Sequence, residues 1–440
     1  MAITQKVPRL SLFPRTAEIN GQNHLVVGGC DTLELVKQYG TPLYVYDELG
    51  VRGMAAQFKN EFTRRYPDTM VIYASKAFIN KAMALILKDE GLGLDVVSAG
   101  EINIAQSAGF PMDKLYFHGN NKSAEELELA VKSGIGRVVV DNGYELALLG
   151  KIAREHKRTQ EILLRINPGI DPHTHKYNTT GIVDSKFGIP SAYREEVIGT
   201  ALKTPGIKLV GLHFHLGSLI LETDPYPQGV ELALDFAASL KQKYGFEMKE
   251  LDIGGGFGVP YTLDMVAPPV SAFAEIIAAT IKKKCQELKL AQPRLIIEPG
   301  RAIVAQSAFA LYTVGVVKEI PGVRCYVSVD GGMGDNIRFA LYGAKHEALI
   351  ANRATEKEST LVTISGKFCE SGDIIIKDIK MPPLAAGDIL AVADCGAYCI
   401  PMSSNYNAFL RPAVAMVKEG KSRLIRRRET FADLTERDLV

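Results

Sequence analysis

Short apolar runs alternate with amphipathic stretches along most of the chain. Runs suited to buried strands cover residues 71–75, 94–97, 115–118, 137–140, 162–166, 209–215, 250–253 and 295–298. Most of the gaps between them hold stretches typical of helices, for example 101–109, 229–240 and 272–288. Eight strand–helix units in succession predict an α/β fold, a closed (β/α)8 TIM-type barrel over residues 41–305, a span that matches the ~250 residues of such barrels.

The pattern changes after residue 301. Short runs with strand character, separated by Pro/Gly turns, cover residues 312–318, 325–330, 361–365, 373–376 and 389–393. They predict a second, β-rich domain of sandwich or barrel type with antiparallel pairing over residues 306–440. The N-terminal arm, residues 1–40, has a strand-like piece at 24–27 and a helix-like piece at 31–40, and we expect it to pair with this domain.

The first of the eight runs ends on a lysine. Side chains alternate along a strand, so Ile72, Ala74 and Lys76 share one face, with Lys76 at the carboxyl end, where α/β enzymes place their sites. Partial burial would favour the neutral amine, a nucleophile that forms Schiff bases with aldehydes. A lysine at a strand end can equally extend into water, so the assignment depends on the rest of the chain.

Polar residues also close the other runs. They are Asp95 with Ser98, His118, Asp141, Asn167, His215, the glycines 254–256, and Glu298. Because the carboxyl ends of parallel barrel strands open on one face, we expect these groups to share one mouth.

The seventh run leads into the segment Leu-Asp-Ile-Gly-Gly-Gly-Phe-Gly at 251–258. Consecutive glycines let backbone N–H groups approach an anion, and barrels often bind phosphate after strands seven and eight. The dinucleotide fingerprint fails because Val259 stands at its third glycine, and no Walker-type loop occurs. A plain tight turn is the alternative.

Glu298 and Arg301 stand in the segment Glu-Pro-Gly-Arg after the eighth run. A carboxylate there can keep a ring nitrogen protonated, and a protonated pyridine is an electron sink. The guanidinium of Arg301 can bind a carboxylate or a phosphate with two hydrogen bonds. A structural ion pair is the alternative for either residue.

His213 and His215 lie on one side of the sixth run. Two histidines on a strand are also typical of metal-dependent barrel hydrolases, which need further ligands on other strands. We favour an imidazole of His215 lying against a flat cofactor ring, no metal, and a buried structural role for His213.

The composition of the chain bears on its binding partners and on its cell compartment. The 51 Lys+Arg residues against 50 Asp+Glu residues leave a net charge of +1, which argues against a nucleic-acid or membrane surface. The six cysteines show no CxxC spacing, and no run approaches the ~20 apolar residues of a membrane span. Residues 1–15 lack the apolar core of a secretory signal, so we expect a cytoplasmic protein with reduced thiols. An organellar leader stays open because Glu18 is the first acid of the chain.

Taken together, these motifs resemble a known family. The chain is similar to the barrel-type, fold type III pyridoxal-phosphate-dependent decarboxylases, and among them to the diaminopimelate decarboxylases. The resemblance spans nearly the whole chain and rests on the segments at residues 73–76, 215–218, 254–258, 298–301, 330–333, 337–342, 369–373, 396–398 and 402–407.

The resemblance implies roles for individual residues. Lys76 would carry pyridoxal 5'-phosphate, His215 would stack on its ring, and Cys369 would be the proton donor. The remaining cofactor contacts implied are Asp95, Ser218, Gly255, Gly256, Glu298, Gly300, Arg301 and Tyr398. The substrate contacts implied are Arg301, Arg338, Tyr342, Glu370 and Tyr398.

The implied reaction is decarboxylation of meso-2,6-diaminopimelate to L-lysine and CO2, the last step of lysine biosynthesis, by a carboxy-lyase. Cys369 would reach in from a second subunit, so the resemblance implies a homodimer with shared sites and an amino acid as the substrate. Decarboxylation of ornithine, arginine or carboxynorspermidine is the nearest alternative. A non-catalytic pyridoxal-phosphate carrier and a metal-dependent hydrolase using His213 and His215 are alternatives of other classes.

Three positions depart from the family pattern. Phe339 stands where the family often has proline, Gly334 where it has asparagine, and Leu219 where it has glutamine. None of these replaces a contact named above. The segment 171–181, with Lys186-Phe-Gly188, also resembles the family and is expected to form a loop over the site.

Overall fold

The computed structural model describes residues 7–170 and 184–439. They form two compact units, each described by itself here. The barrel unit comprises Ala55–Gly258 and Ala267–Arg301, and the sheet unit comprises Met1–Met54, Val259–Val266 and Ala302–Val440.

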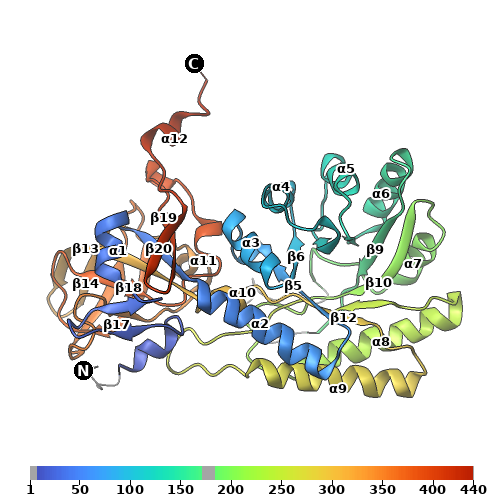
Figure 1. Cartoon of the computed structure of the whole chain (residues 1–440), viewed down its shortest axis with the longest axis horizontal. Helices are drawn as coiled ribbons and strands as arrows, with labels where there is room; N and C mark the ends of the chain where they lie inside the picture. Colours follow the sequence, from blue (N-terminus) through green and yellow to red (C-terminus); the bar gives the residue numbers. More distant parts are fainter. Residues whose placement is uncertain (1–6, 171–183, 440) are drawn as a thin grey trace. The chain divides into compact units, whose positions relative to one another are not determined.

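The barrel unit contains a closed barrel of eight parallel strands, in the order β5 to β12, with β12 returning to β5 (Figure 1). The strands are β5 (Thr69–Ala74), β6 (Gly93–Val96), β7 (Leu115–Phe117), β8 (Arg137–Val140), β9 (Gln160–Arg165), β10 (Ile207–His213), β11 (Glu250–Asp252) and β12 (Arg294–Ile297). The predicted (β/α)8 barrel is confirmed, and each of the eight runs assigned to it corresponds to one of its strands.

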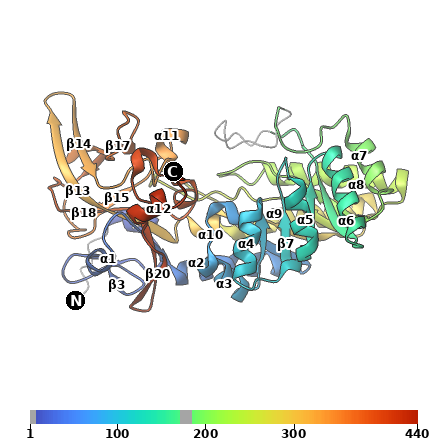
Figure 2. The same cartoon turned by 90° about the horizontal axis from the view of Figure 1, so that it is seen from above.

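Helices fill the connections between the strands, and in Figure 2 helices α3 to α6 follow one another along the barrel. They are α2 (Glu48–Arg65), α3 (Lys81–Asp89), α4 (Ala99–Ser107), α5 (Ala124–Ser133), α6 (Gly143–Glu155), α7 (Arg194–Ala201), α8 (Pro225–Tyr244), α9 (Val270–Leu288) and α10 (Arg301–Val304), with the short 3-10 turns η2 (Ser75–Ala77) and η3 (Met112–Lys114). Side-chain caps on backbone N–H groups begin α3, α4, α5 and α6, from Asn80, Ser98, Ser123 and Asn142. Ser98, one of the polar residues at a strand end, is therefore a helix cap.

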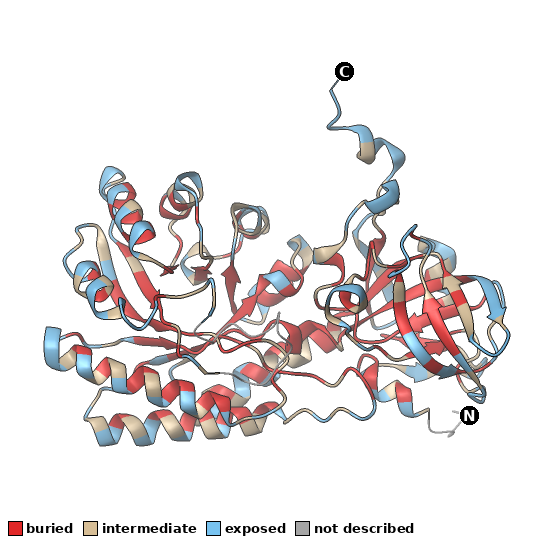
Figure 3. Ribbon diagram, turned by 180° about the vertical axis from the view of Figure 1, so that it is seen from behind, coloured by how far each residue is buried: buried red, intermediate tan, exposed pale blue. Residues whose placement is uncertain are grey.

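Apolar side chains fill the barrel interior, and Figure 3 shows the strands as buried and the outer helix faces as exposed. One interior cluster joins six side chains from β5, β7, β8, β9, β10 and β12, namely Ile72, Tyr116, Val139, Leu163, Val210 and Ile296.

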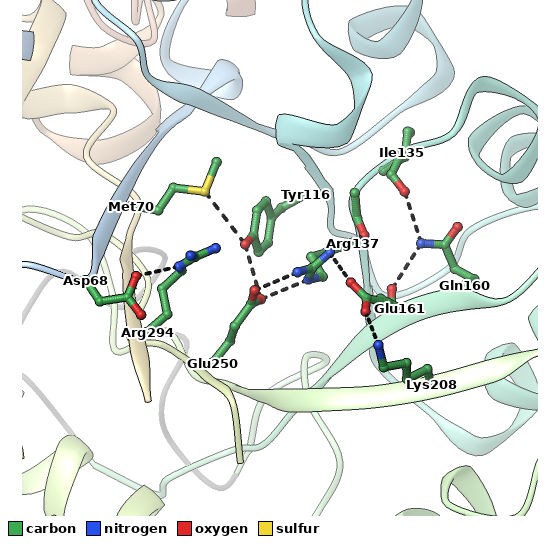
Figure 4. A network of polar contacts seen from close by, with 11 residues as sticks. Asp68, Met70, Tyr116, Ile135, Arg137, Gln160, Glu161, Lys208, Glu250 and Arg294 are labelled. Atoms are coloured by element: carbon green, nitrogen blue, oxygen red, sulfur yellow. Dashed lines mark hydrogen bonds and ion pairs between the residues drawn. The ribbon is translucent and has the colours of Figure 1, made fainter. Parts of the chain in front are cut away.

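A polar network closes the amino end of the barrel (Figure 4). Arg137 at the start of β8 binds Glu250 at the start of β11 through two hydrogen bonds of 2.9 and 2.7 Å. Tyr116 donates to the same carboxylate at 3.2 Å, and Arg137 also pairs with Glu161 at 2.6 Å. Lys208 continues the network to Glu161. Each charged group in this network has a partner of opposite charge.

The sheet unit is built on strands in the order β17-β16-β14-β13-β4-β19-β20, with β18 on β13 and β15 on β18. The strands are β4 (Leu43–Asp47), β13 (Ala308–Ile320), β14 (Arg324–Val329), β15 (Ala348–Ile350), β16 (Thr360–Ser365), β17 (Ile374–Met381), β18 (Ile389–Val392), β19 (Ala413–Lys418) and β20 (Lys421–Arg426). Its short helices include η1 (Pro8–Leu12), α1 (Thr32–Tyr39), α11 (Arg338–Tyr342), η4 (Ile400–Met402), η5 (Tyr406–Ala408) and α12 (Phe431–Thr435). The β-rich fold is confirmed, but the expected antiparallel pairing is incomplete, because β14–β16 and β4–β19 pair in parallel.

The N-terminal arm folds into a small sheet of its own, made of β1 (Glu18–Ile19), β2 (Leu25–Val27) and β3 (Cys30–Asp31). Leu25 donates a backbone hydrogen bond to Ala351, and the arm's apolar residues share a core with β13, β18 and β19.

Strand β4 lies at the centre of the large sheet, between β13 and β19, and all five of its residues are buried. The compact units therefore divide differently from the predicted boundary at residue 41, because residues 43–47 find their hydrogen-bond partners in the sheet unit. Among the helices of the described residues, none has the length and apolarity needed to cross a membrane.

Candidate active site

Ionisable side chains converge inside the carboxyl end of the barrel. Asp95 lies on β6, His213 and Asp252 end β10 and β11, and His118 and Glu298 directly follow β7 and β12. All five are at most 5% exposed. Charged residues usually lie on the protein surface, where they interact with water. A buried group of ionisable side chains at the end of a barrel where active sites form therefore indicates a functional site.

Glu298 is at the centre of this group. Its Oε1 lies 2.8 Å from Nε2 of His118 and 3.7 Å from Nε2 of His213. The two imidazole rings are 4.8 Å apart and nearly perpendicular. Nε2 of His118 is also 3.8 Å from Oδ1 of Asp95, so one imidazole faces two carboxyl groups.

The pKa values separate the acids of this group. Burial alone would raise the pKa of Glu298, but the neighbouring imidazoles of His118 and His213 lower it well below its ordinary value. Burial raises the pKa of Asp252 well above its usual range, and the charge of Glu298 adds to this effect. Glu298 is therefore the acid with the lowered pKa, and Asp252 is the acid with the raised pKa.

Burial also lowers the pKa of His213 to about 3, so its imidazole is neutral at physiological pH. Burial raises the pKa of Asp95, against the lowering effect of His118.

Several buried polar atoms at this end have no aligned hydrogen-bond partner among the described residues. They are Ser75 Oγ, Asp95 Oδ1, His118 Nε2, both ring nitrogens of His213, Asp252 Oδ2 and Glu298 Oε1. Buried polar groups normally find partners, because leaving one without costs about 1–3 kcal/mol. A cluster of such atoms fits a site prepared for a polar ligand.

Lys76 stands in η2, directly after β5, as the sequence predicted, but it is exposed rather than partly buried as expected, because the turn η2 carries it past the last paired residue of the strand. Its positive charge lowers the pKa of Asp95 and of Glu101, on α4, although burial leaves both values raised overall, that of Glu101 to about 7. Lys76 also helps to lower the pKa of His215, after burial as the main cause. These effects place the amine at the mouth that contains Glu298.

The glycine segment after β11 packs tightly against the neighbouring strand ends. A side chain at Gly255 would lie 2.1 Å from the carbonyl oxygen of Glu298, and one at Gly256, whose φ is 95°, would lie 2.5 Å from that of Gly217. Gly255 donates its N–H to Nδ1 of His215 at 3.2 Å, which fixes that nitrogen as an acceptor.

Arg301 and Ser218 meet at the same end of the barrel. Nη2 of Arg301 donates to Oγ of Ser218 at 3.0 Å. Gly300 packs closely against Ala74, which lies two residues before Lys76. A Cβ added to Gly300 would lie 2.9 Å from the Cβ of Ala74. The barrel unit thus brings together Lys76, Asp95, His215, Ser218, Gly255, Gly256, Glu298, Gly300 and Arg301.

Sequence reasoning missed three ionisable residues here. Arg165 ends β9, is buried, and stacks its guanidinium 4.4 Å from the ring centre of Phe187. Glu101 accepts a hydrogen bond from the N–H of Val97 at 2.7 Å. Asp252 was treated only as part of the glycine segment. The charged residue at the end of an apolar run was the available signal for Arg165 and Asp252.

The predicted loop at 171–181 lies outside the described residues. Near it, Gly188 donates its N–H to Oδ1 of Asp141 at 2.9 Å, and Ile189 pairs with Ile166. Asp141 therefore anchors the chain after this segment.

In the sheet unit, Arg338 begins α11 and is 4% exposed. Its guanidinium carbon lies 4.2 Å from the ring centre of Tyr261, and Nη1 lies 3.4 Å from Nε2 of His346. No carboxylate of the described residues lies within ion-pair distance of Arg338. A buried guanidinium held by an aromatic ring and an imidazole fits an anionic ligand.

Asp394 and Tyr398 belong to a strained segment of the sheet unit. Both have positive φ values, 57° and 60°, which residues with side chains rarely adopt. Burial raises the pKa of Asp394 well above its usual range, against the lowering effect of Arg338. Tyr398 and Tyr342 are both half-buried.

Two motifs of the sheet unit are held together by one carboxylate. Asp373 accepts hydrogen bonds from the N–H groups of Met333, at 2.6 Å, and Phe368, at 2.7 Å. The next residues, Cys369 and Glu370, are exposed, and the N–H of Cys369 donates to Asn407 at 2.8 Å. The segment that carries the predicted proton donor is thus fixed in its backbone and open at its side chains.

The metal alternative has a different set of candidate ligands from the one expected. Among the described residues, His118, His213 and Glu298 have potential ligand atoms within 4.8 Å of one another. His215 is not in this set.

Comparison with known proteins separates these alternatives. Residues 52–305 match the family model for the pyridoxal-binding domain of pyridoxal-dependent decarboxylases. The diaminopimelate decarboxylase of Bacillus subtilis is 46% identical over 96% of this chain and 97% of its own. The chain belongs to the diaminopimelate decarboxylase family.

Solved structures agree with this assignment. The diaminopimelate decarboxylase of M. jannaschii, in complex with L-lysine, has a TM-score of 0.91 at 35% identity, over 99% of both chains. That of Helicobacter pylori, also with L-lysine, has a TM-score of 0.85 at 33% identity, over 92% of this chain and 98% of its own. The chain is a pyridoxal-dependent decarboxylase by family, which favours this class over the hydrolase and the carrier.

Proposed function

We propose that this protein removes CO2 from meso-2,6-diaminopimelate to form L-lysine, using pyridoxal 5'-phosphate. The observation that carries the proposal is Glu298, a buried and ionised acid at the carboxyl end of the barrel, in the same mouth as Lys76. The family and the lysine complexes of its relatives support the substrate and the place in lysine biosynthesis.

The residues of the barrel mouth fit this cofactor. Oε1 of Glu298, which has no aligned donor among the described residues, suits a protonated ring nitrogen, and the neutral imidazole of His215 suits the face of a ring. Ser218, Gly255, Gly256, Gly300 and Arg301 offer a hydroxyl, backbone N–H groups and a guanidinium to the phosphate, while Asp95 and Tyr398 complete the cofactor contacts. When bound, the cofactor supplies an electron sink for the pair left by the departing CO2.

Lys76 would hold the cofactor through its amine, the nucleophile that an aldehyde requires. Whenever this amine is free and protonated, it needs a site for its charge. Asp95 and Glu101 provide acceptors at the mouth, since both interact with this charge.

Cys369 completes the reaction in this proposal. The bond between the α-carbon and its carboxylate breaks, CO2 leaves, and the electron pair stays at the α-carbon. The thiol of Cys369 then gives its proton to that carbon and becomes a thiolate, which takes a proton back from water. Its exposure suits a residue that acts in the site of a second copy, so we propose a homodimer with shared sites.

The substrate contacts follow from charge. Arg338, buried without a carboxylate partner among the described residues, suits the distal carboxylate of the substrate, together with Arg301 and Tyr342. Glu370 suits the distal ammonium, and Tyr398 contacts both cofactor and substrate. A substrate that carries both distal charges satisfies all of these groups. The reduced cysteines are consistent with a cytoplasmic location.

The test compares CO2 release from meso-2,6-diaminopimelate, ornithine and arginine by the protein reconstituted with pyridoxal 5'-phosphate. We expect the diaminopimelate kcat/KM to exceed the other two by at least ~100-fold, because a substrate without the distal carboxylate leaves Arg338 unpaired. Arg338→Met serves as the matched variant and should lose most of this preference. Comparable turnover of ornithine contradicts the substrate assignment, and absence of CO2 release from all three favours the carrier. Activity that a chelator abolishes favours the metal-dependent hydrolase.

A further inference from the structure

The two acids at the centre of the barrel mouth have pKa values shifted in opposite directions, although both are buried. The pKa of Glu298 lies well below its ordinary value, whereas that of Asp252 lies well above its own. They stand on neighbouring strand ends and are 4% and 0% exposed, so burial does not distinguish them. The difference must come from the groups that face each acid.

His118 is the group that distinguishes them. Its Nε2 is 2.8 Å from Oε1 of Glu298, the closest approach of any cationic or imidazole nitrogen to this carboxylate among the described residues. No ion pair of the described residues reaches Asp252. The other charged or titratable groups of the described residues that interact with Glu298 are His213 and His215 at the end of β10, Asp252 on β11, Arg165 on β9 and Asp95 on β6.

The position of His118 is itself fixed. Its backbone N–H donates to Val96 at 2.8 Å, which continues the β6–β7 pairing past the end of β7. Its ring packs against that of His213 in a T-shaped arrangement, and Oδ1 of Asp95 lies 3.8 Å from Nε2 of His118. Nε2 of His118 thus lies between the carboxyl groups of Glu298 and Asp95, and the side chain would lose both contacts if it moved away.

We propose that His118 is a positioning residue, which holds Glu298 as a carboxylate and in the orientation that the ring nitrogen of the cofactor requires. This inference rests on the proposed function. His118 contacts Glu298 rather than the reacting atoms, and its effect therefore passes through one hydrogen bond of the cofactor ring. Removing His118 should weaken that bond alone.

The experiment measures how much the ring nitrogen contributes to binding. Dissociation constants are determined for pyridoxal 5'-phosphate and for its 1-deaza analogue, in which a C–H replaces the ring nitrogen. In the parent protein we expect the natural cofactor to bind tighter than the analogue by about tenfold to a hundredfold, since a hydrogen bond to a charged group is lost.

Variants at His118 decide the proposal. His118→Leu and His118→Asn, whose side chains do not reach Glu298, should bring the ratio of the two constants to within about threefold of one. His118→Gln, with a longer amide, should retain more of the ratio than His118→Asn. The matched control is His156→Leu, which removes an imidazole paired with Glu128 at 3.0 Å on the outer surface and should leave the ratio unchanged.

A merely structural role would weaken binding of both ligands equally and keep the ratio of the parent protein in all variants. That result, or equal ratios for the Gln and Asn variants, overturns the proposal. If His118→Leu does not fold, His118→Asn decides alone.

As a second readout, the 15N signal of ring-labelled cofactor should report a protonated nitrogen in the parent protein and an unprotonated one in His118→Asn. A parent protein that binds neither ligand instead contradicts the proposed function.

Discussion

The two ends of the barrel are built from the same strands but treat charge in opposite ways. At the amino end, Glu250 is held by two hydrogen bonds from Arg137 and one from Tyr116 (Figure 4). At the carboxyl end, Glu298 has only imidazoles within ion-pair distance among the described residues, and its Oε1 has no aligned donor.

The difference shows which end of the molecule is adapted for stability and which for ligand binding. A buried acid with a complete set of partners adds no unmet desolvation cost to the folded state, and removing a partner destabilises the protein. A buried acid with an incomplete set of partners destabilises the folded state, and a ligand that completes the set binds with a correspondingly more favourable free energy. The amino end should therefore respond to mutation in its free energy of unfolding, and the carboxyl end in its activity.

The largest effect is expected from Arg137→Met at the amino end. This change leaves Glu250 buried without its cation, so the free energy of unfolding in urea should fall by about 3–5 kcal/mol. The kcat/KM of the remaining folded protein should stay within about twofold of the parent value, because Arg137 does not contact the mouth.

A double variant is the control. Arg137→Met combined with Glu250→Leu replaces the pair by apolar groups and should regain most of the lost stability. If the single variant instead lowered kcat/KM by tenfold in folded protein, the separation between the two ends would be contradicted.

At the carboxyl end, Glu298→Gln should act on catalysis. The amide cannot keep a ring nitrogen protonated, so we expect kcat to fall by at least ~100-fold, or about 2.7 kcal/mol. The free energy of unfolding should change by less than about 1 kcal/mol or rise, because a buried charge is removed. Steady-state CO2 release and urea unfolding measure the two effects. A variant that lost stability but kept kcat would place Glu298 with the residues of the amino end.

The smallest effect concerns the pH dependence of stability. Burial raises the pKa of Glu101 from 4.5 to about 7, so its contribution to stability is complete below pH 4.5 and is lost as the pH rises through 7. Glu101→Gln stays neutral and can still accept from Val97. Relative to the parent, it should therefore gain stability between pH 5 and pH 8.

The full shift would be worth roughly 3 kcal/mol, and we expect about half of it because the side chain keeps some contact with water. Urea unfolding without added cofactor at both pH values measures the gain. A difference between variant and parent that does not vary with pH would show that Glu101 has an ordinary carboxyl pKa.

The barrel could be predicted almost entirely from the hydrophobic pattern, because parallel strands buried on both faces are continuous apolar runs. The sixth run was placed two residues late, at 209–215 against Ile207–His213, since the apolar Phe214 extends the pattern past the last paired residue. The strands of the sheet unit were harder to predict from the sequence. Strands β19 and β20 were missed, and the partner of β19 is β4, more than 360 residues earlier, which no local pattern reveals.

The site was predictable where a polar residue interrupts an apolar run, as at Asp95, His118 and Glu298. Glu101 was not predictable in this way, because it begins an amphipathic stretch in which acids usually face water, and its burial arises only from packing. The roles of Arg338, Cys369, Glu370 and Tyr398 came from family resemblance, and their assignment stays a prediction. Arg338 is buried with no carboxylate within ion-pair distance among the described residues, and this supports its assignment on independent physical grounds.

The most direct measurement concerns the amine at the barrel mouth. The protein is incubated with pyridoxal 5'-phosphate, reduced with borohydride, digested, and its peptides are analysed by mass spectrometry. The account predicts that the cofactor is attached to the peptide that contains Lys76, and that the Lys76→Ala variant shows no such attachment. Attachment at any other lysine, or none in the parent protein, would contradict it.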